Sequence, residues 1–421
     1  MPPDRPEIVR RSDCRICHGT SLKPILSLGP TPLANAFLSG PDTFAAERRY
    51  PLDVAFCPGC GLLQLVDVVD PEVLFREYIY VTGTSSTQTA HARAYAETVV
   101  DLLHLGAGDL VAEVASNDGT FLRAFGAHGV RTLGIEPARN IAAEAAAVGI
   151  ETVNEFFTRA LGAQLRASRG PARAVVANNV LAHVDDPGDL LAGCRELVAD
   201  DGLIVVEAPY VGDMLDRVEY DTIYHEHLSY FGIGPLLRLA ESAALRIVRV
   251  DRVSVHGGSL RVFFSRSAAS HSSDVLEMEA AERSRGLADA ARYYRFADDV
   301  EASRTALVGL LSRLVAEGRM VAAYGAPAKG NTLLNFCGID TRLIRYTVDR
   351  NPRKVGLFTP GTHIPVRPVS ALTGDGRPPD HLLILAWNIA EEIIQQQHEY
   401  RARGGRFIVP VPRARVIGEA S

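Results

Sequence analysis

The chain has 421 residues, of which 47% are hydrophobic and 22% are charged, and this is the composition of a globular protein large enough for two or three domains. Its net charge of −6 gives no basic footprint for a nucleic acid. The longest apolar runs, GLIVVEA and HLLILAW, are too short to cross a bilayer, and the first residues lack an apolar signal segment. We therefore expect a cytoplasmic protein with no nucleic-acid or membrane partner.

Four of the six cysteines form two pairs with the same two-residue spacing, Cys14 with Cys17 and Cys57 with Cys60. Two such pairs supply four thiolates to one tetrahedral zinc ion and leave no coordination position open. Four unrelated buried thiols would not explain the pairing, so the spacing predicts a structural zinc site. The other two cysteines stand alone in apolar surroundings, and we expect them in the core.

From residue 101 onward, strand patterns alternate with helix patterns. The segment DLVAEVASNDGTFLRAF predicts a buried strand, a turn that ends at Gly119 and a helix. RTLGIEPARNIAAEAAAVG then predicts a second strand that ends in Glu136, and a further strand, helix and strand follow. This succession indicates a doubly wound α/β sheet whose ligand lies at the carboxyl ends of the strands.

The residues at these strand ends suggest which ligand is bound. Glu136 is placed to accept hydrogen bonds from the two ribose hydroxyls of an adenosine. The first turn, EVASNDGTF, has one glycine where a pyrophosphate loop has three. An adenosine ligand without phosphates, S-adenosylmethionine, therefore fits best, although another nucleotide stays open at this stage. Glu113 and Asn117 would line its amino-acid end, and Asn178 and Asn179 would lie near the same crevice.

The last third predicts a second, smaller Rossmann-like unit. Residues 274–318 read as one long helix or two shorter ones, and strand and helix patterns follow until RFIVPVP closes the unit as a last strand. The turn that carries Lys329 and Asn331 has only scattered glycines, so a second dinucleotide is not expected. Its lysine and backbone amides could instead contact the diphosphate of a sugar nucleotide.

Several motifs occur along the chain in a fixed order, namely the two cysteine pairs, EVASNDGTFL, GIEPARNIA, NNVLAHV, YHEH, HGGSLRVF, YGAPAKGNTLLN, VDRNPRKVG, LAWN and GGRFIVPVP. With these motifs the chain resembles the C-methyltransferases that act on nucleotide-linked 4-keto deoxysugars in antibiotic biosynthesis. The resemblance covers nearly the whole chain. It implies an N-terminal zinc-binding domain (1–72), a central S-adenosylmethionine-dependent methyltransferase domain (73–270) and a C-terminal Rossmann-like domain that contributes to the nucleotide-sugar site (271–421).

The resemblance also implies the substrate and the form of the enzyme. It favours a thymidine diphosphate sugar, methylation at carbon 3 and a monomer, while carbon 5 stays open. A competing class is an NAD(P)-dependent ketosugar oxidoreductase, which would need the glycine-rich pyrophosphate loop that neither half of the sequence contains.

The segment Tyr224-His225-Glu226-His227 would carry the chemistry of this reaction. A carbon beside a ketone becomes nucleophilic only after a base removes its proton, and histidine is suited to this task near neutral pH. By resemblance the base is His227, which Tyr224 and Glu226 would assist, with His225 a less certain neighbour. A tyrosine would also lie near the reacting centre, with Tyr78 as the first choice and Tyr80 as the second. From the residues alone, a structural polar cluster remains the competing interpretation.

The remaining expected contacts involve the cofactor and the sugar. The residues expected to bind the cofactor are Glu113, Asn117, Gly119, Glu136, Asn178, Asn179, Ser86 and Thr87. The residues expected to contact the substrate are His183, Lys329 and Asn331.

Overall fold

The computed structural model describes residues 7–84, 86–254, 257–374 and 377–417. The chain divides into two compact units, each assembled from separate segments of the sequence. Unit 1 contains Met1–Lys23, Ala55–Gly212 and Leu228–Ala290, and unit 2 contains Pro24–Val54, Asp213–His227 and Ala291–Ser421. Among the described residues, no helix combines the length and the apolar character that a membrane crossing requires.

Unit 1 contains a seven-stranded sheet with the order β12-β13-β10-β9-β6-β7-β8. Its strands are β6 (Leu110–Val114), β7 (Arg131–Ile135), β8 (Thr152–Val153), β9 (Ala172–Asn178), β10 (Val198–Pro209), β12 (Arg246–Val253) and β13 (Ser259–Ser265). The five neighbouring strands β10, β9, β6, β7 and β8 pair in parallel. Strand β13 pairs antiparallel with β10 and with β12. Because β6 lies between β7 and β9, the strand order reverses there, and open α/β sheets bind ligands at such a point.

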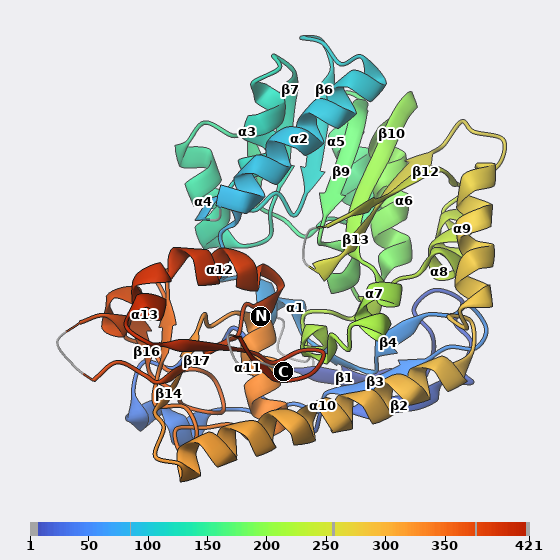
Figure 1. Cartoon of the computed structure of the whole chain (residues 1–421). Helices are drawn as coiled ribbons and strands as arrows, with labels where there is room; N and C mark the ends of the chain where they lie inside the picture. The colour runs from blue at the N-terminus through green and yellow to red at the C-terminus, as the bar shows by residue number, and fades with distance from the viewer. Residues whose placement is uncertain (1–6, 85, 255–256, 375–376, 418–421) are drawn as a thin grey trace. The chain divides into compact units, whose positions relative to one another are not determined.

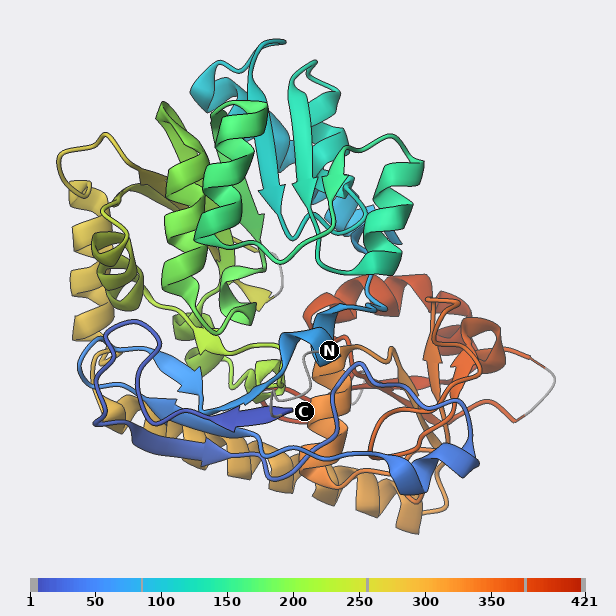
Figure 2. The same ribbon diagram turned by 180° about the vertical axis from the view of Figure 1, so that it is seen from behind.

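Helices cover both faces of this sheet. They are α2 (Ser86–Leu103), α3 (Thr120–Gly126), α4 (Arg139–Ala147), α5 (Arg159–Arg169), α6 (Pro187–Leu197), α8 (Ile233–Ser242) and α9 (Ser273–Ser284). Figure 1 shows α2 and α3 in front of the sheet, and Figure 2 shows the green helices α5 and α6 over the opposite face. The core beneath α2 and α3 joins apolar side chains of both helices to those of β6, β9 and β10, including Tyr95, Phe125 and Val176. Strands covered on both faces read as continuous apolar runs, which explains GLIVVEA.

Shorter elements complete unit 1. Strand β1 (Ile8–Arg10) pairs antiparallel with β5 (Asp67–Val69), and β4 (Leu63–Leu65) pairs antiparallel with β11 (Ser229–Tyr230). Helix α1 (Pro71–Phe75) begins at Asp70, whose carboxylate accepts a hydrogen bond from the Glu72 amide. The chain passes between the units at β2 (Lys23–Ser27), β3 (Asp53–Phe56), α7 (Val211–Asp216) and α10 (Ala290–Ala316).

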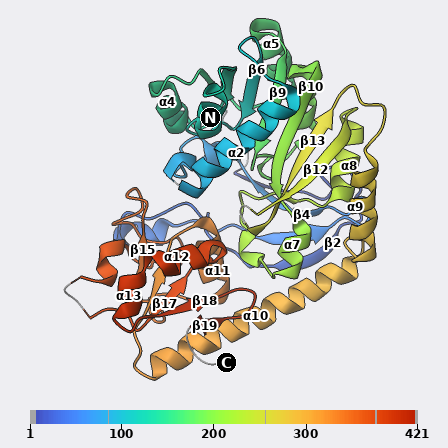
Figure 3. The same cartoon turned by 45° about the horizontal axis from the view of Figure 1, so that its top comes forward.

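Unit 2 contains a six-stranded sheet with the order β16-β15-β14-β17-β18-β19. Its strands are β14 (Val321–Tyr324), β15 (Thr347–Asp349), β16 (Val366–Pro368), β17 (His381–Ile384), β18 (Arg406–Val409) and β19 (Arg415–Ile417), and its helices include α11 (Ala328–Cys337), α12 (Ala390–Gln396) and α13 (His398–Ala402). Figure 3 shows α12 and α13 beside this sheet. Apolar side chains of the two helices and of the sheet form one buried cluster. The predicted α/β fold with a second Rossmann-like sheet is therefore confirmed.

The structure adds detail to three expectations for unit 2 and the core. Residues 274–318 form two helices, α9 and α10, rather than one. The strand in RFIVPVP ends at Val409, because Pro410 and Pro412 have no amide hydrogen for the ladder. A further strand, β19, follows and pairs antiparallel with β18. Cys194 and Cys337 are buried, as expected.

Candidate functional site

The four paired cysteines meet in unit 1. Their sulfur atoms all lie within 4.8 Å of one another, with 3.4 Å between Cys14 and Cys60 and 3.5 Å between Cys17 and Cys57. These separations suit a tetrahedral ion with Zn–S bonds of about 2.3 Å. The hydrogen bond between Cys14 and Cys60 lowers the pKa of the Cys14 thiol and raises the pKa of the Cys60 thiol, so a metal ion would have to displace protons to bind all four sulfurs as thiolates. The donor set therefore fits zinc in a closed, structural site.

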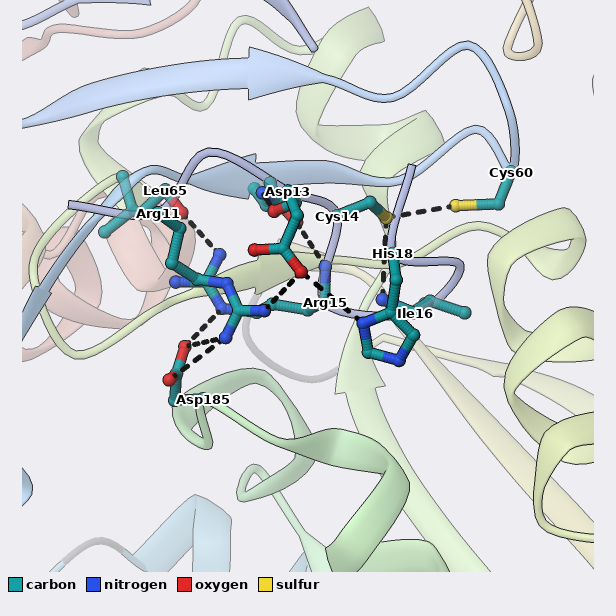
Figure 4. Close-up of polar contacts among 10 residues, drawn as sticks. Arg11, Asp13, Cys14, Arg15, Ile16, His18, Cys60, Leu65 and Asp185 are labelled. Carbon is teal, nitrogen blue, oxygen red and sulfur yellow. Dashed lines mark hydrogen bonds and ion pairs between the residues drawn. The ribbon is translucent and has the colours of Figure 1, made fainter. Parts of the chain in front are cut away.

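An arginine inside the first cysteine pair connects this site to two other segments of unit 1. The Arg15 side chain is fully buried, its Nε donates to Asp185 at 3.1 Å, and its guanidinium also donates to the Leu65 carbonyl (Figure 4). Arg11 donates to the same carboxylate at 3.1 Å. Asp185 follows the short helix η3 (Leu181–His183). The cysteine pair is thus bonded to the loop that carries the predicted substrate residue His183.

The first turn of the sheet has the backbone that its sequence suggested. Gly119 adopts a φ of +74°, and a side chain there would meet Ile150. Asn117 is also left-handed, with a φ of 49°, a conformation that asparagine adopts more readily than most residues. These two residues allow the chain to reverse sharply between β6 and α3. The turn therefore brings its amides to the carboxyl edge of the sheet.

Glu136 lies beside this turn at the end of β7. It is 5% exposed, and its two oxygens accept hydrogen bonds from the Asn117 and Ala138 amides, both at 2.8 Å. Burial raises the pKa of Glu136, and these two amide bonds oppose the shift. A carboxylate oxygen has two lone pairs, so each oxygen can accept a further hydrogen bond. The geometry is compatible with the predicted ribose contact.

Glu113 and Asn178 form the other part of this edge. Glu113 is 2% exposed, and its Oε1 is 3.5 Å from the Asn178 amide nitrogen. In the described part of the chain, neither Glu113 Oε2 nor Asn178 Oδ1 has a hydrogen-bond partner. Buried polar atoms of this kind are costly unless something binds them. Because an ammonium group would pair with both oxygens, the edge fits the amino-acid end of S-adenosylmethionine.

The segment before α2 is fastened to the same edge. The backbone amide of Tyr78 donates to the Asn140 Oδ1 at 3.0 Å, and the Tyr78 carbonyl accepts from the Asn140 Nδ2 at 2.7 Å. The Asn117 Oδ1 accepts from the Thr82 amide at 2.8 Å. The rings of Tyr78 and His183 both contact the ring of Phe75, each at 5.8 Å. Unit 1 therefore brings Tyr78 and His183 together around one aromatic ring.

Three further residues, Asn179, Thr87 and Ser86, were also predicted to bind the cofactor. Asn179 has a φ of 54°, and its amide donates to the Glu207 carbonyl at 2.8 Å. Thr87 lies on an exposed position of α2. Ser86 is the first residue of α2, and its side chain lies outside the described part of the structure.

His227 in unit 2 makes hydrogen bonds through both of its ring nitrogens. Its Nδ1 lies 2.8 Å from the Thr222 carbonyl, and its Nε2 lies 2.8 Å from the Tyr224 hydroxyl. Since a carbonyl only accepts, Nδ1 carries the hydrogen and Nε2 is the basic nitrogen, which accepts from Tyr224. The histidine is 8% exposed. It therefore has one defined tautomer, with its basic nitrogen at a phenol.

His225 points in another direction. Its Nε2 lies 3.3 Å from the Tyr50 carbonyl and 3.2 Å from the Pro51 carbonyl, and the residue is 1% exposed. Burial lowers the pKa of His225 to about 4, so the ring is neutral and donates to the backbone. This arrangement holds residues 50–51 rather than presenting a base.

Lys329 and Asn331 lie at the start of α11 in unit 2. The Lys329 ammonium is 3.8 Å from Glu219 and 5.4 Å from the centre of the Trp387 ring. The Asn331 Nδ2 donates to the Ala34 carbonyl at 2.7 Å, and this asparagine is 1% exposed. The two predicted diphosphate contacts thus have protein partners, and Asn331 holds the chain near Ala34.

Two neighbours of the YHEH segment were not expected from the sequence. Trp387 Nε1 donates to Asp221 at 2.6 Å and fixes η4 (Tyr220–Thr222), which supplies the carbonyl to His227. Asn35 donates to Glu226 at 2.7 Å. The LAWN motif marked Trp387 without showing its partner, and no local pattern marked Asn35.

Comparisons with known proteins agree with this geometry. Family descriptions match three successive parts of the chain: "Putative zinc binding domain" at residues 14–75, "Methyltransferase domain" at 88–250 and "C-methyltransferase C-terminal domain" at 254–412. The four cysteines lie within the first match. The fold and its two sites define an S-adenosylmethionine-dependent methyltransferase with a zinc-binding cluster of four cysteines.

Similarity to one curated protein indicates which kind of methyltransferase this is. The chain is 42% identical over 418 residues to the C-methyltransferase NovU of Streptomyces niveus, and the match covers 99% of each protein. The chain therefore belongs to the family of S-adenosylmethionine-dependent C-methyltransferases that includes NovU, as the sequence motifs predicted.

Solved structures show more distant similarity. The CcbJ methyltransferase of Streptomyces caelestis is 15% identical, and the match covers 47% of this chain and 97% of that one with a TM-score of 0.34. Magnesium protoporphyrin IX methyltransferase from Synechocystis PCC 6803 with bound S-adenosylmethionine is 13% identical, with 47% and 89% coverage and a TM-score of 0.33.

Proposed function

We propose that this enzyme methylates carbon 3 of a thymidine diphosphate-linked 4-keto deoxysugar in antibiotic sugar biosynthesis, with His227 as the base. It would act as a monomer in the cytoplasm. The observation that carries the proposal is the tautomer of His227, since the Thr222 carbonyl holds the hydrogen on Nδ1 and leaves Nε2 as the proton acceptor. A neutral imidazole of this kind is a suitable base for a hydrogen beside a ketone.

Each group in the reaction has a separate task. S-adenosylmethionine, when bound, supplies an electrophilic methyl group. Glu136 would accept hydrogen bonds from the ribose hydroxyls, and Glu113 with Asn178 would hold the amino-acid end of this cofactor. His227 would take the proton from the sugar carbon, and the electron pair would pass to the ketone oxygen to give an enolate. The enolate carbon would then bond to the methyl group, and the carbon–sulfur bond would break.

The Tyr224 hydroxyl is hydrogen-bonded to the basic nitrogen of His227. The proton of the sugar carbon could therefore reach that nitrogen by two routes. The phenol would either move aside, so that Nε2 takes the proton directly, or relay the proton to Nε2. Direct transfer predicts that Tyr224→Phe keeps most of the rate. A relay predicts a loss as large as that of His227→Ala. We favour direct transfer, with Tyr224 as a support.

The first test separates proton removal from methyl transfer. With S-adenosylhomocysteine bound in deuterated water, the wild-type enzyme should wash deuterium into the carbon beside the ketone, because enolisation needs no methyl group. His227→Ala should bind both ligands and lose about a hundred- to ten-thousand-fold of this exchange. Near wild-type exchange and methylation in the alanine variant would show that another group, such as Tyr78, is the base.

The second test identifies the reaction. Incubation with S-adenosylmethionine and the 4-keto sugar nucleotide should give a product heavier by one methyl group, and its NMR spectrum should place the methyl on carbon 3. A methyl on carbon 5 would correct the position but keep the class. Binding of NADPH without binding of S-adenosylmethionine would support the oxidoreductase alternative instead.

A further inference from the structure

Residues 31–51 of unit 2 lie between the two cysteine pairs in the sequence and contact three other segments of the same unit. The Tyr50 and Pro51 carbonyls accept from His225. The Ala34 carbonyl accepts from Asn331, and the Leu38 amide donates to the Phe358 carbonyl at 3.0 Å. The stretch Pro32–Leu38 (PLANAFL) is therefore built into the unit that carries the proposed base.

Asn35 makes the most direct of these contacts. Its Nδ2 donates to Glu226 Oε1 at 2.7 Å, and Glu226 is 3% exposed. An amide NH₂ donates to an ionised carboxylate, and such a hydrogen bond favours the charged form of a buried acid. The bond also fixes the rotation of the Glu226 side chain. Glu226 is the residue before His227 in the segment that carries the proposed base.

A buried lysine, Lys354, interacts electrostatically with Glu226. Lys354 comes from the loop after β15, with its ammonium 2.8 Å from the Ala326 carbonyl and 5.1 Å from the centre of the Phe37 ring. Burial lowers the pKa of Lys354, and the charges of Asp349 and Glu226 oppose this shift. The titratable groups beside Glu226 on the same segment are Tyr224, His225 and His227.

We propose that Asn35 is a positioning residue that keeps Glu226 an ionised hydrogen-bond acceptor. Glu226 then accepts a hydrogen bond from a hydroxyl of the substrate and does not protonate the enolate oxygen. This inference rests on the proposed function, because it takes the YHEH segment as the site of the reaction. It assigns a role in the reaction to a residue from the sequence between the zinc-binding cysteines.

The test is the pH dependence of kcat/KM for Asn35→Asp. The new carboxylate would lie against Glu226, and two carboxylates at this distance share one proton, so the pKa of the pair rises. The acidic limb of the profile should therefore move to higher pH by about one unit or more. On that limb kcat/KM should then be about tenfold lower than in the wild type at the same pH. Activity should recover at high pH. Asn35→Ala, which only removes the donor, should shift the limb less.

The matched control is Asn351→Asp in the same unit. The Asn351 Oδ1 accepts from the Arg353 amide at 3.0 Å, so an aspartate keeps this bond and adds the same charge. Its profile should match that of the wild-type enzyme. A uniform loss at every pH for Asn35→Asp would indicate a purely structural role and overturn the inference. Higher activity of Asn35→Asp at neutral pH would also overturn it, since Glu226 would then act as a proton donor.

Glu226→Gln distinguishes failure of this inference from failure of the proposed function. The glutamine can still accept from Asn35 but carries no charge. If Glu226→Gln loses activity while Asn35→Asp keeps the wild-type profile, only the role of Asn35 is wrong. If Glu226→Gln and His227→Ala both methylate at the wild-type rate, the proposed site itself is wrong.

Discussion

At the scale of single residues, the two histidines of the YHEH segment have opposite environments. The His227 ring has its Nε2 at the Tyr224 phenol, whereas the Nε2 of His225 faces two backbone carbonyls. A polar side chain that fastens a buried backbone segment contributes to stability rather than to proton transfer. We therefore expect the two histidines to respond differently to pH and to mutation.

His225 should make the stability of the protein depend on pH. Its pKa is about 4 in the folded protein against 6.5 ordinarily, so the unfolded chain binds more protons between these values. The free energy of unfolding should fall as the pH drops from about 6.5 to 4, by up to about 3 kcal/mol. Denaturant unfolding at pH 7 and pH 5 should show a smaller decline for His225→Gln than for the wild type. The exposed His128→Gln variant should match the wild type, and equal slopes for all three proteins would contradict the assignment.

At the scale of elements, a buried ion cluster joins α2 to two strands of unit 1. Glu207 on β10 is 2.6 Å from Arg261 on β13 and 2.8 Å from His91 on α2, and it is 1% exposed. Burial raises the pKa of Glu207, but the hydrogen bond and charge of His91 and the charge of Arg261 outweigh this and lower it. The guanidinium also lies 4.4 Å from the centre of the Tyr95 ring.

Breaking this cluster should destabilise unit 1. Arg261→Met leaves a buried carboxylate with only His91 opposite it, and we expect a loss of about 3 kcal/mol in the free energy of unfolding. Combining it with Glu207→Gln should restore part of the loss, because the unpaired charge is gone. Arg249→Met is the control, since Arg249 pairs with Asp251 on the surface of β12 and such pairs contribute about 0–1 kcal/mol. If Arg261→Met and Arg249→Met lowered the free energy of unfolding in urea equally, the buried ion cluster would not stabilise unit 1 through its charges.

At the scale of the whole molecule, the metal should stabilise the fold rather than take part in the reaction. The four-cysteine cluster is closed, and Arg15 ties it to the loop after η3. Freshly purified protein should contain about one zinc per chain, and chelation should unfold the N-terminal part of unit 1. Cys14→Ser should lose zinc and lower the melting temperature, whereas Cys194→Ser should keep its metal. Less than half an equivalent of zinc in the wild-type protein would contradict this prediction.

The local patterns in the sequence predicted most of the elements and the residue types of the sites. Paired cysteines, apolar runs and a single-glycine turn are encoded within a few residues, because spacing and burial determine them. The four-cysteine cluster and the sheet with Glu136 at its edge were predicted in this way, whereas membership in the C-methyltransferases was predicted from the resemblance of the ordered motifs to that family. The strand β19 was missed because its three residues carry no distinct pattern and are defined by pairing with β18.

The contacts between distant parts of the chain were decided by the tertiary structure. Asn35 and Glu226 are 191 residues apart, and His91 and Glu207 are 116 apart, so no spacing rule connects them. The sequence placed two histidines close together, but only the fold gave one of them a phenol and the other a pair of backbone carbonyls. The reason is physical: a short segment determines its own periodicity and turns, whereas the partner of a buried polar group depends on which other segments the folded chain brings against it.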